Sequence, residues 1–347
     1  MNATDRLAAL SGATVAVTGG FGLVGSRIVH KLRAIGATPL AVGRLDAYGS
    51  PVSCVFRISP ADSDVIAGDI TDSALMDHVV GRADYVIHAA ALADVAECTR
   101  NPGAALQANI QGTQTVLDAA ARHSATLKRL VFVSSASVYG VGAGSTTVGA
   151  RFSEEDPLRP ASVYANTKLW GEYQTALTLG GAGSSYTVVR YFSVYGEPQV
   201  VKENSHSWVV AWFAMRAALG LPLHLNGGGR QVRDFVHVDD IAEATLLAAV
   251  TDRADRATVN IGTGRATSIR QVADLVRHHY PAAQILDTPR PEGDPLGACA
   301  DITRMREVLD WAPRVDIETG VRRYLHWLER TPEAIPAWLR AQARAAA

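Results

Sequence analysis

A glycine-rich turn near the N-terminus, TGGFGLVG at residues 18–25, constrains the fold more than any other stretch of this chain. It follows an apolar run at 13–18, typical of a buried strand, and leads into a segment at 25–36 with apolar residues at helical spacing. Gly19, Gly22 and Gly25 let the backbone turn tightly and approach a pyrophosphate, whose charge the N–H groups of the helix N-terminus can bind. The turn therefore predicts a dinucleotide site.

Further strand candidates alternate with helix candidates through the first two-thirds of the chain. Strands are expected at 38–43, 85–90, 130–135 and 186–192, and helices at 112–123 and 162–177. Strands that are apolar throughout are buried on both faces, as in a parallel sheet covered by helices. The pattern predicts a Rossmann-type, doubly wound α/β fold. After residue 193, loops with Gly and Pro and short elements predict a smaller C-terminal lobe, interleaved with late sheet elements.

Composition and charge narrow the kinds of partner. The chain of 347 residues has 48% hydrophobic and 19% charged residues and a formal net charge of −1. These values predict a folded protein with a large core and no surface for nucleic acid or membrane. Cys54, Cys98 and Cys299 are too few and too scattered to indicate a disulfide framework or a metal site. The first residues do not resemble a signal peptide, and a cytoplasmic location is expected.

The end of the second strand, AVGRLDAYG at residues 41–49, leaves the phosphate state of the cofactor open. An acid about 20 residues after the glycine turn hydrogen-bonds the adenosine ribose of NAD. The nearby carboxylate, Asp46, comes slightly late for this role. Arg44 fits a 2′-phosphate instead, so NADP stays possible beside NAD.

Two further segments carry groups suited to proton transfer. VSSASVYG at residues 133–140 ends a strand in hydroxyl groups, where open α/β sheets bind ligands. YANTK places Tyr164 and Lys168 four residues apart, on one face of a helix. A nearby ammonium favours the phenolate, so we expect Lys168 to lower the pKa of Tyr164. Such a phenol can take a proton from a sugar hydroxyl while a nicotinamide takes the hydride.

Together these segments resemble the extended short-chain dehydrogenase/reductase superfamily. Within it, the chain is most similar to the NAD-dependent nucleotide-sugar epimerase/dehydratase family, and in detail to UDP-glucuronate 4-epimerases. Besides the glycine turn, the serine cluster and YANTK, the family's motifs occur in order along nearly the whole chain. They are GDITD (68–72), HAAALADVAECTRNP (88–102), RYFSVYG (190–196), RDFVHVDDIAEA (233–244), VNIGTG (259–264) and LDWAP (309–313).

The resemblance implies roles for individual residues. The catalytic positions are Ser135, Tyr164 and Lys168. The cofactor-binding positions are Gly19, Phe21, Gly22, Leu23, Gly25, Arg44, Asp46, Asp69, Ile70, Ala90, Ala91, Asn109, Tyr164 and Lys168, with Asn109 matching a structural asparagine. The substrate-binding positions are Ala93, Ser135, Ser137, Ser193, Lys202, Arg233, Arg290 and Asp294. No metal is implied.

The same resemblance implies the cofactor, the partners and the division of the chain. NAD is the expected cofactor, because a redox cycle that closes on one enzyme needs no supply of NADPH. A UDP-sugar is the expected substrate, and a homodimer the expected assembly. Residues 1–192 would form the NAD-binding Rossmann domain with the catalytic residues, and 193–347 the nucleotide-sugar-binding lobe.

The residues after Ser135 bear on the reaction. Dehydratases of this family resemble one another in an Asp-Glu pair there, and decarboxylases tend to carry Glu at the second position. This chain has Ala136 and Ser137 instead. The resemblance thus favours C4 epimerisation through a 4-keto sugar. In it, Tyr164 removes the O4 proton, Ser135 holds O4, and the C4 hydride passes to NAD⁺ and returns on the other face. Ser137 and Ser193 would satisfy the hydroxyl groups of both poses.

Three substrates or reactions stay open at this point. UDP-glucuronate/UDP-galacturonate is the favoured pair. Val200 stands where such epimerases carry a carboxylate-binding Arg, although Lys202 is close, so UDP-glucose/UDP-galactose is an alternative. An NADPH-dependent nucleotide-4-ketosugar reductase would use the same catalytic residues, and Arg44 would favour it.

Overall fold

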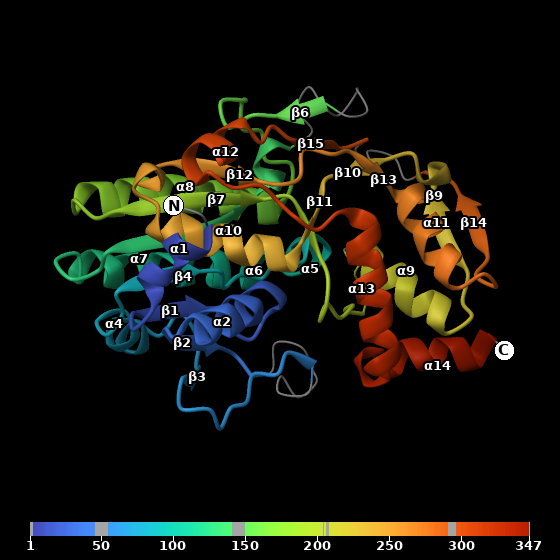
Figure 1. Cartoon of the computed structure of the whole chain (residues 1–347), viewed down its shortest axis with the longest axis horizontal. Coiled ribbons are helices and arrows are strands. Elements are labelled where there is room, and N and C mark those ends of the chain that lie inside the picture. Colours follow the sequence, from blue (N-terminus) through green and yellow to red (C-terminus); the bar gives the residue numbers. More distant parts are fainter. Residues whose placement is uncertain are drawn as a thin grey trace.

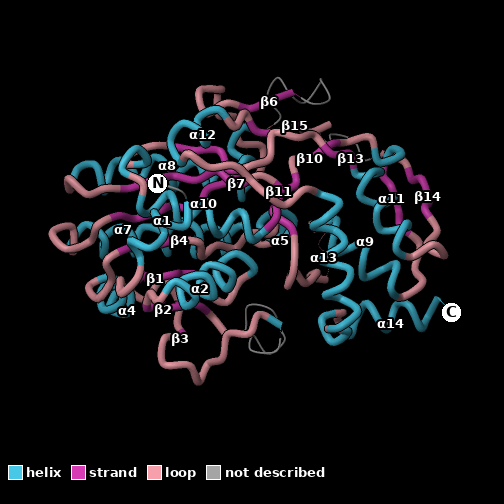
Figure 2. Tube along the Cα trace, in the orientation of Figure 1, coloured by secondary structure: helices cyan, strands magenta, loops and turns pink. Residues whose placement is uncertain are grey.

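The computed structural model of this chain describes residues 3–45, 55–140, 150–203, 205, 208–290 and 296–346. A seven-stranded sheet has helices on both faces (Figures 1 and 2). Neighbouring strands in it are all parallel, in the order β12-β7-β5-β4-β1-β2-β3. The strands are β1 (Thr14–Thr18), β2 (Thr38–Gly43), β3 (Val65–Ala67), β4 (Tyr85–His88), β5 (Arg129–Ser135), β7 (Tyr186–Tyr191) and β12 (Thr258–Ile261).

The strand order reverses at β1, and this reversal locates the site. The chain runs from β1 outward to β2 and β3, then returns to β4 on the other side of β1 and continues to β5, β7 and β12. Ligands of open α/β sheets bind at such a reversal, outside the carboxyl ends of the strands. The glycine turn after β1 and the serine cluster after β5 both follow carboxyl ends of this kind. The predicted Rossmann-type fold is confirmed.

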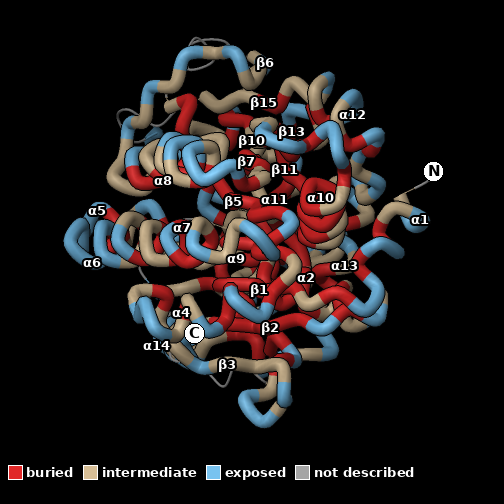
Figure 3. The backbone as a smooth tube through the Cα atoms, turned by 90° about the vertical axis from the view of Figure 1, so that its left-hand side faces the viewer, coloured by how far each residue is buried: buried red, intermediate tan, exposed pale blue. Residues whose placement is uncertain are grey.

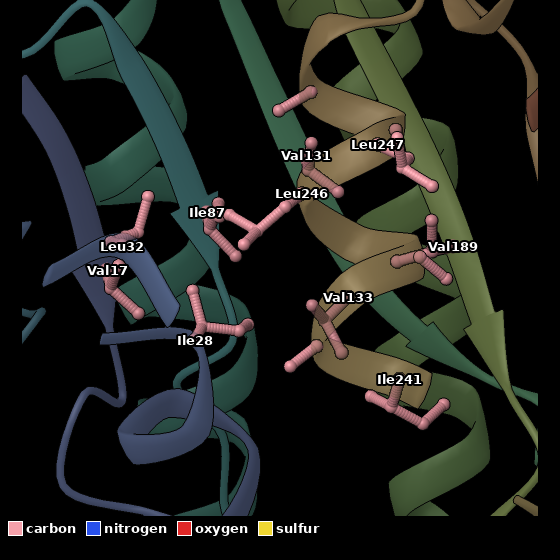
Figure 4. Packing of buried hydrophobic residues seen from close by; sticks show 14 of the residues in the cluster. Val17, Ile28, Leu32, Ile87, Val131, Val133, Val189, Ile241, Leu246 and Leu247 are labelled. Atoms are coloured by element: carbon pink, nitrogen blue, oxygen red, sulfur yellow. The ribbon is translucent and has the colours of Figure 1, made fainter. Parts of the chain in front are cut away.

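Both faces of the sheet are buried, as the apolar strands predicted. Val15 and Val17 of β1 pack on one face and Ala16 on the other. Helices α2 (Leu23–Ile35) and α10 (Val238–Val250) cover the first face, where Leu246 and Leu247 meet strand residues (Figure 4). Helices α4 (Ser73–Val80), α7 (Gly112–Arg122) and α8 (Val163–Gly181) cover the second. The buried strands form the centre of the molecule in Figure 3.

A second hydrophobic core belongs to the C-terminal part, with its buried members all between Tyr195 and Leu339. Its helices are α9 (Val209–Ala218), α11 (Ile269–His279), α13 (Ile317–Arg330) and α14 (Ala337–Ala346). Its strand pairs are β8 (Ser193–Tyr195) with β11 (Phe235–His237), β9 (Leu223–Asn226) with β14 (Ile285–Thr288), and β10 (Val232–Arg233) with β13 (Thr267–Ser268). Because β12 and α10 join the large sheet, this part of the chain contributes to both cores. The domain boundary at residue 193 stays a prediction.

Short elements complete the fold. They are α1 (Ala3–Leu7), α5 (Val95–Arg100), α6 (Pro102–Leu106), α12 (Thr303–Leu309) and the pair β6 (Ala150–Phe152) with β15 (Ala298–Ala300). The sequence did not predict β3, which is three residues long and only partly buried. Among the helices of the described residues, each is too short or too polar to cross a membrane.

Replacing Leu246 by Ala should destabilise the protein by about 2–5 kcal/mol, because the side chain is fully buried between α10 and the sheet. Leu177→Ala on α8 is the matched control, since its side chain is 72% exposed. It should change the free energy of unfolding by less than about 0.5 kcal/mol. Denaturant unfolding of both variants measures the difference, and equal losses would contradict this account of the core.

Candidate active site

The glycine turn forms a cradle whose shape excludes side chains. Gly19 has a φ of 74°, and a Cβ there would lie 2.8 Å from the Ala90 backbone nitrogen. A Cβ on Gly25 would lie 2.0 Å from the Gly19 carbonyl oxygen. The backbone of β1, the first turn of α2 and the start of the segment after β4 therefore pack directly on one another. Helix α2 begins at Leu23 without a capping side chain, which leaves its first N–H groups for an anion.

A buried histidine, His88, links the strand before this cradle to helix α7. His88 lies between two hydroxyl groups, with Nδ1 2.7 Å from Thr18 Oγ1 and Nε2 2.9 Å from Thr113 Oγ1. The Ala90 N–H donates to the same Thr18 oxygen at 3.3 Å. Burial lowers the pKa of His88 to about 3, so the imidazole is neutral at physiological pH. The sequence analysis did not assign this role, although His88 stands at the start of the motif that it singled out.

A pocket of about 520 Å³ joins the cradle to the C-terminal part of the chain. It brings together most of the cofactor and catalytic positions that the sequence predicted. The predicted residues in its lining are Gly19, Phe21, Gly22, Leu23, Gly25, Arg44, Asp69, Ile70, Ala90, Ala91, Ala93, Ser135, Tyr164, Lys168 and Lys202. A cavity of this size, with a few convergent polar groups, is suited to a cofactor and a small substrate.

Asn109 lies just behind the lining and holds one wall. Its Oδ1 accepts from the Leu92 N–H at 2.7 Å, and its Nδ2 donates to Leu92 O at 3.1 Å and to Thr167 Oγ1 at 3.0 Å. The side chain thus ties the segment after β4 to α8. This geometry agrees with the structural asparagine that the family resemblance implied.

Arg44 and Asp69 face each other at the end of the pocket formed by β2 and β3. Arg44 Nη1 lies 3.8 Å from Asp69 Oδ2, and both side chains are exposed. The other carboxylate oxygen of Asp69 accepts from the backbone and hydroxyl of Thr71, at 2.9 and 2.8 Å. The family resemblance implies that Asp69 lies beside the adenine base, and a carboxylate here opposes a further phosphate group nearby. Asp46 lies outside the described residues.

The catalytic positions meet where β5 ends against the first turns of α8. Tyr164 and Ser135 both line the pocket there, and Ser135 Oγ accepts from the Ser137 N–H at 3.2 Å and from Ser137 Oγ at 3.0 Å. Ser162 caps α8 by accepting from the Ala165 N–H at 3.1 Å, which fixes the helix start two residues before Tyr164. Two hydroxyl groups at the pocket wall are therefore poised to share one oxygen of a ligand.

The structure contradicts the expectation that Lys168 lowers the pKa of Tyr164. Burial raises the pKa of Tyr164 to about 12, and the nearby Ser135 hydroxyl lowers this pKa by less. The Lys168 ammonium lies 6.0 Å from the centre of the Tyr164 ring and donates to Val133 O at 2.8 Å. Burial lowers the pKa of Lys168 itself to about 8. The expectation of a lowered tyrosine pKa is wrong for the protein alone, because spacing on a helix does not report desolvation.

The remaining substrate positions lie outside the pocket lining. Ser137 contacts the site only through Ser135. Ser193, in β8, donates its N–H to Asp234 O at 2.9 Å, while the next residue, Val194, lines the pocket. Arg233, in β10, donates to Val232 O at 2.8 Å, and Arg290 is exposed after β14. Asp294 lies outside the described residues.

A buried ion pair behind Ser135 was also missed by the sequence analysis. Arg190 on β7 makes two hydrogen bonds with Glu172 on α8, at 2.9 and 2.7 Å. Glu172 also accepts from the hydroxyl of Ser134, the residue before Ser135. Charged residues in a strand and a helix give no sign of pairing in the sequence, because only the fold brings them together.

Comparisons with known proteins agree with this site. The model of the NAD dependent epimerase/dehydratase family matches residues 15–262. A putative UDP-glucose 4-epimerase of Methanocaldococcus jannaschii is 30% identical over 319 residues, which cover 91% of this chain and 98% of that protein.

Solved structures give the same result. The UDP-glucose 4-epimerase of Thermotoga maritima with UDP-glucose has a TM-score of 0.82 and 30% identity, covering 92% of this chain and 99% of its own. MoeE5 in complex with UDP-glucuronic acid and NAD has a TM-score of 0.77 and 30% identity, with coverage of 92% and 99%. The chain belongs to the NAD dependent epimerase/dehydratase family. It is an enzyme of nucleotide-sugar chemistry, and its cofactor is NAD.

The residues present fit NAD. Gly19 and Gly25 leave room for a pyrophosphate at the start of α2, and Asp69 offers a carboxylate at the other end of the cradle. Bound NAD⁺ supplies a hydride acceptor and a positive charge, which no side chain of the protein can provide. Tyr164, Ser135 and Lys168 line the same pocket and are the side chains predicted to supply proton transfer and hydrogen bonds.

Lys168→Met should change how the stability of the nucleotide-free protein depends on pH. The wild-type pKa falls from 10.5 to about 8 on folding, so burial of the cation opposes folding fully below pH 8. The free energy of unfolding of the wild type should therefore rise between pH 8 and 10.5. Over that range the wild type should gain about 3 kcal/mol relative to the variant. Denaturant unfolding at several pH values measures this. Lys128→Met, at an exposed position, is the control and should follow the wild type; a gap that is constant with pH would contradict the argument.

Proposed function

We propose that this enzyme interconverts the C4 epimers of a UDP-hexose, with UDP-glucuronate/UDP-galacturonate as the favoured pair. The observation that carries the proposal is that Tyr164, Ser135 and Lys168 line one pocket, with the Ser135 hydroxyl close enough to lower the pKa of Tyr164. The positions after Ser135 hold Ala136 and Ser137, which cannot serve as the acids that elimination or decarboxylation needs.

The side chains divide the work at C4. The Tyr164 phenolate takes the proton of the C4 hydroxyl, and the Ser135 hydroxyl donates a hydrogen bond to the same oxygen as it becomes a carbonyl. Burial raises the pKa of Tyr164 to about 12 in the protein alone, so the phenolate would depend on nearby positive charge from Lys168 and bound NAD⁺. Lys168 supplies positive charge close to the phenolate. The keto sugar turns over within the pocket and is reduced on its opposite face.

Lys202 supports a substrate with a carboxylate at C6. Lys202 lines the pocket together with Gln199 and Val200 of the same segment. Burial lowers the pKa of Lys202, while the charges of Asp94 and Glu97 raise it. A charged donor in a partly dry site forms strong hydrogen bonds to a carboxylate. The similarity to MoeE5, solved with UDP-glucuronic acid, also supports a uronate.

Val200 favours a second candidate, UDP-glucose/UDP-galactose. It lines the pocket where the resemblance to UDP-glucuronate 4-epimerases implied an arginine. An apolar side chain tolerates a neutral CH₂OH group better than a carboxylate. A 4-ketosugar reductase is less favoured, because Arg44 faces the Asp69 carboxylate, which would repel the 2′-phosphate of NADPH. A homodimer and a cytoplasmic location stay predictions.

The proposed reaction is tested with purified protein, UDP-glucuronate, and no added reductant. Chromatography of the sugar nucleotides should reveal UDP-galacturonate and no net change in NAD redox state. Tyr164→Phe should lower kcat by about 10²–10⁴-fold, because it removes the group that transfers the proton, while bound NAD is retained. Tyr173→Phe, on the same helix and 58% exposed, is the control and should keep full activity. Near-wild-type turnover by Tyr164→Phe would exclude this mechanism.

Lys202→Ala should separate the two substrate candidates. If Lys202 binds the uronate carboxylate, kcat/KM for UDP-glucuronate should fall roughly ten- to a hundredfold, the value of about 1.5–3 kcal/mol for a charged hydrogen bond. The value for UDP-glucose should change by less than about threefold, because its C6 group is neutral. Lys128→Ala, at an exposed site, controls for loss of net charge. Equal losses for both sugars would remove Lys202 from the carboxylate site, and faster turnover of UDP-glucose by the wild type would overturn the uronate preference.

A further inference from the structure

The segment after β8, residues 196–203, forms one wall of the pocket on the side of the C-terminal lobe. Its residues Gln199, Val200 and Lys202 line the pocket. The segment has no regular secondary structure along most of its length. Because loops of this kind are mobile unless other groups hold them, the contacts that fix it decide how well the wall fits a substrate.

Helix α13 holds the start of this segment through an ion pair. Glu197 Oε1 accepts from Arg323 Nη2 at 2.7 Å and from Arg323 Nε at 3.2 Å. Arg323 Nη2 also donates to Asp239 Oδ2 at 2.5 Å, and Asp239 Oδ1 accepts from Arg27 Nε of α2 at 2.6 Å. Arg323 therefore connects the segment to the first turn of α10 and, through Asp239, to the helix that begins at the cofactor cradle.

His237 also belongs to this network, because it contacts both Glu197 and the backbone of Asp239. Its Nδ1 accepts from the Asp239 N–H at 3.2 Å, which leaves Nε2 as the nitrogen that carries a proton. That Nε2 lies 3.3 Å from Glu197 Oε2 and donates to it. The His237 side chain is fully buried, and Glu197 is only 14% exposed. Glu197 is thus held on both oxygens, in a site where water competes little.

The next residue of α13 holds the middle of the segment. The Tyr324 hydroxyl donates to the Gln199 carbonyl oxygen at 2.7 Å, and the tyrosine is fully buried. Neither Arg323 nor Tyr324 lines the pocket. Gln199, which Tyr324 holds, lines it directly, and Glu197, which Arg323 holds, belongs to the same segment. The direct contacts of these two side chains with the pocket wall are made through the 196–203 segment.

We propose that Arg323 and Tyr324 are positioning residues that set the affinity for the sugar part of the substrate, by holding the 196–203 segment against the pocket. The proposal rests on the proposed function for its choice of substrate, a UDP-hexose. Residues outside the recognised motifs thus shape its sugar-binding wall. Asp239 keeps its hydrogen bond from Arg27 of α2 when Arg323 is replaced, so cofactor binding should change little.

Hydrogen exchange and steady-state kinetics of the full-length enzyme test this role with matched variants. Arg323→Gln and Tyr324→Phe should speed amide exchange in residues 196–203 by roughly tenfold, the effect of one lost hydrogen bond. KM for the preferred UDP-hexose should rise about three- to tenfold, with kcat within about twofold. A looser wall weakens binding of the substrate and of the transition state by the same amount, and such a loss appears in KM alone. Bound NAD should be unchanged. Arg322→Gln, the exposed neighbour on α13, is the control and should alter none of these values.

Each outcome bears on a different claim. Unchanged exchange in both variants, or a fall in kcat without a rise in KM, overturns the positioning role. Tyr324→Phe keeps the ring in the core, so it still reports if Arg323→Gln folds poorly. If the wild type turns over no UDP-sugar, the proposed function fails. Exchange, together with calorimetry of UDP-glucuronate binding, then still decides whether the two residues hold the wall.

Discussion

Helix α8 lies so close to β5 that the buried Lys168 ammonium donates to the Val133 carbonyl oxygen at 2.8 Å. One turn further along α8, Glu172 accepts from Ser134 of β5 and pairs with Arg190 of β7. The ion pair is buried, so removing either partner would leave a charge without compensation, at a cost of about 3–5 kcal/mol. The helix that carries Tyr164 is therefore held at two points on the strand that carries Ser135, and the catalytic geometry follows from that packing.

The two halves of the site are built in different ways. The cofactor side is made of backbone, because the approach of Gly19 to Ala90 and of Gly25 to Gly19 leaves no room for side chains. The proposed sugar side has the 196–203 segment as its wall, which side chains of α13 hold. Such a division separates the shared redox step from the choice of sugar, since the wall can change while the cradle stays fixed.

Sequence predicted the parts of the site that depend on local patterns. Gly19, Gly25, Ser135 and the Tyr164–Lys168 spacing each follow from one strand end, one turn or one helix face, and the structure brings them to one pocket.

The missed features depend on contacts between distant residues. Arg323 and Glu197 are 126 positions apart, and Arg190 and Glu172 belong to different elements. The predicted direction of the Tyr164 pKa shift was wrong, because burial, which the helix pattern does not report, outweighs the nearby charge.

The central claim is that hydride leaves C4 and returns to the same sugar within one enzyme. UDP-glucuronate carrying deuterium at C4 tests it most directly, with mass spectrometry of the separated C4 epimers. The account predicts UDP-galacturonate that keeps the deuterium at C4, formed without release of NADH. Loss of the deuterium to solvent, or formation of product only when a reduced cofactor is added, would contradict it.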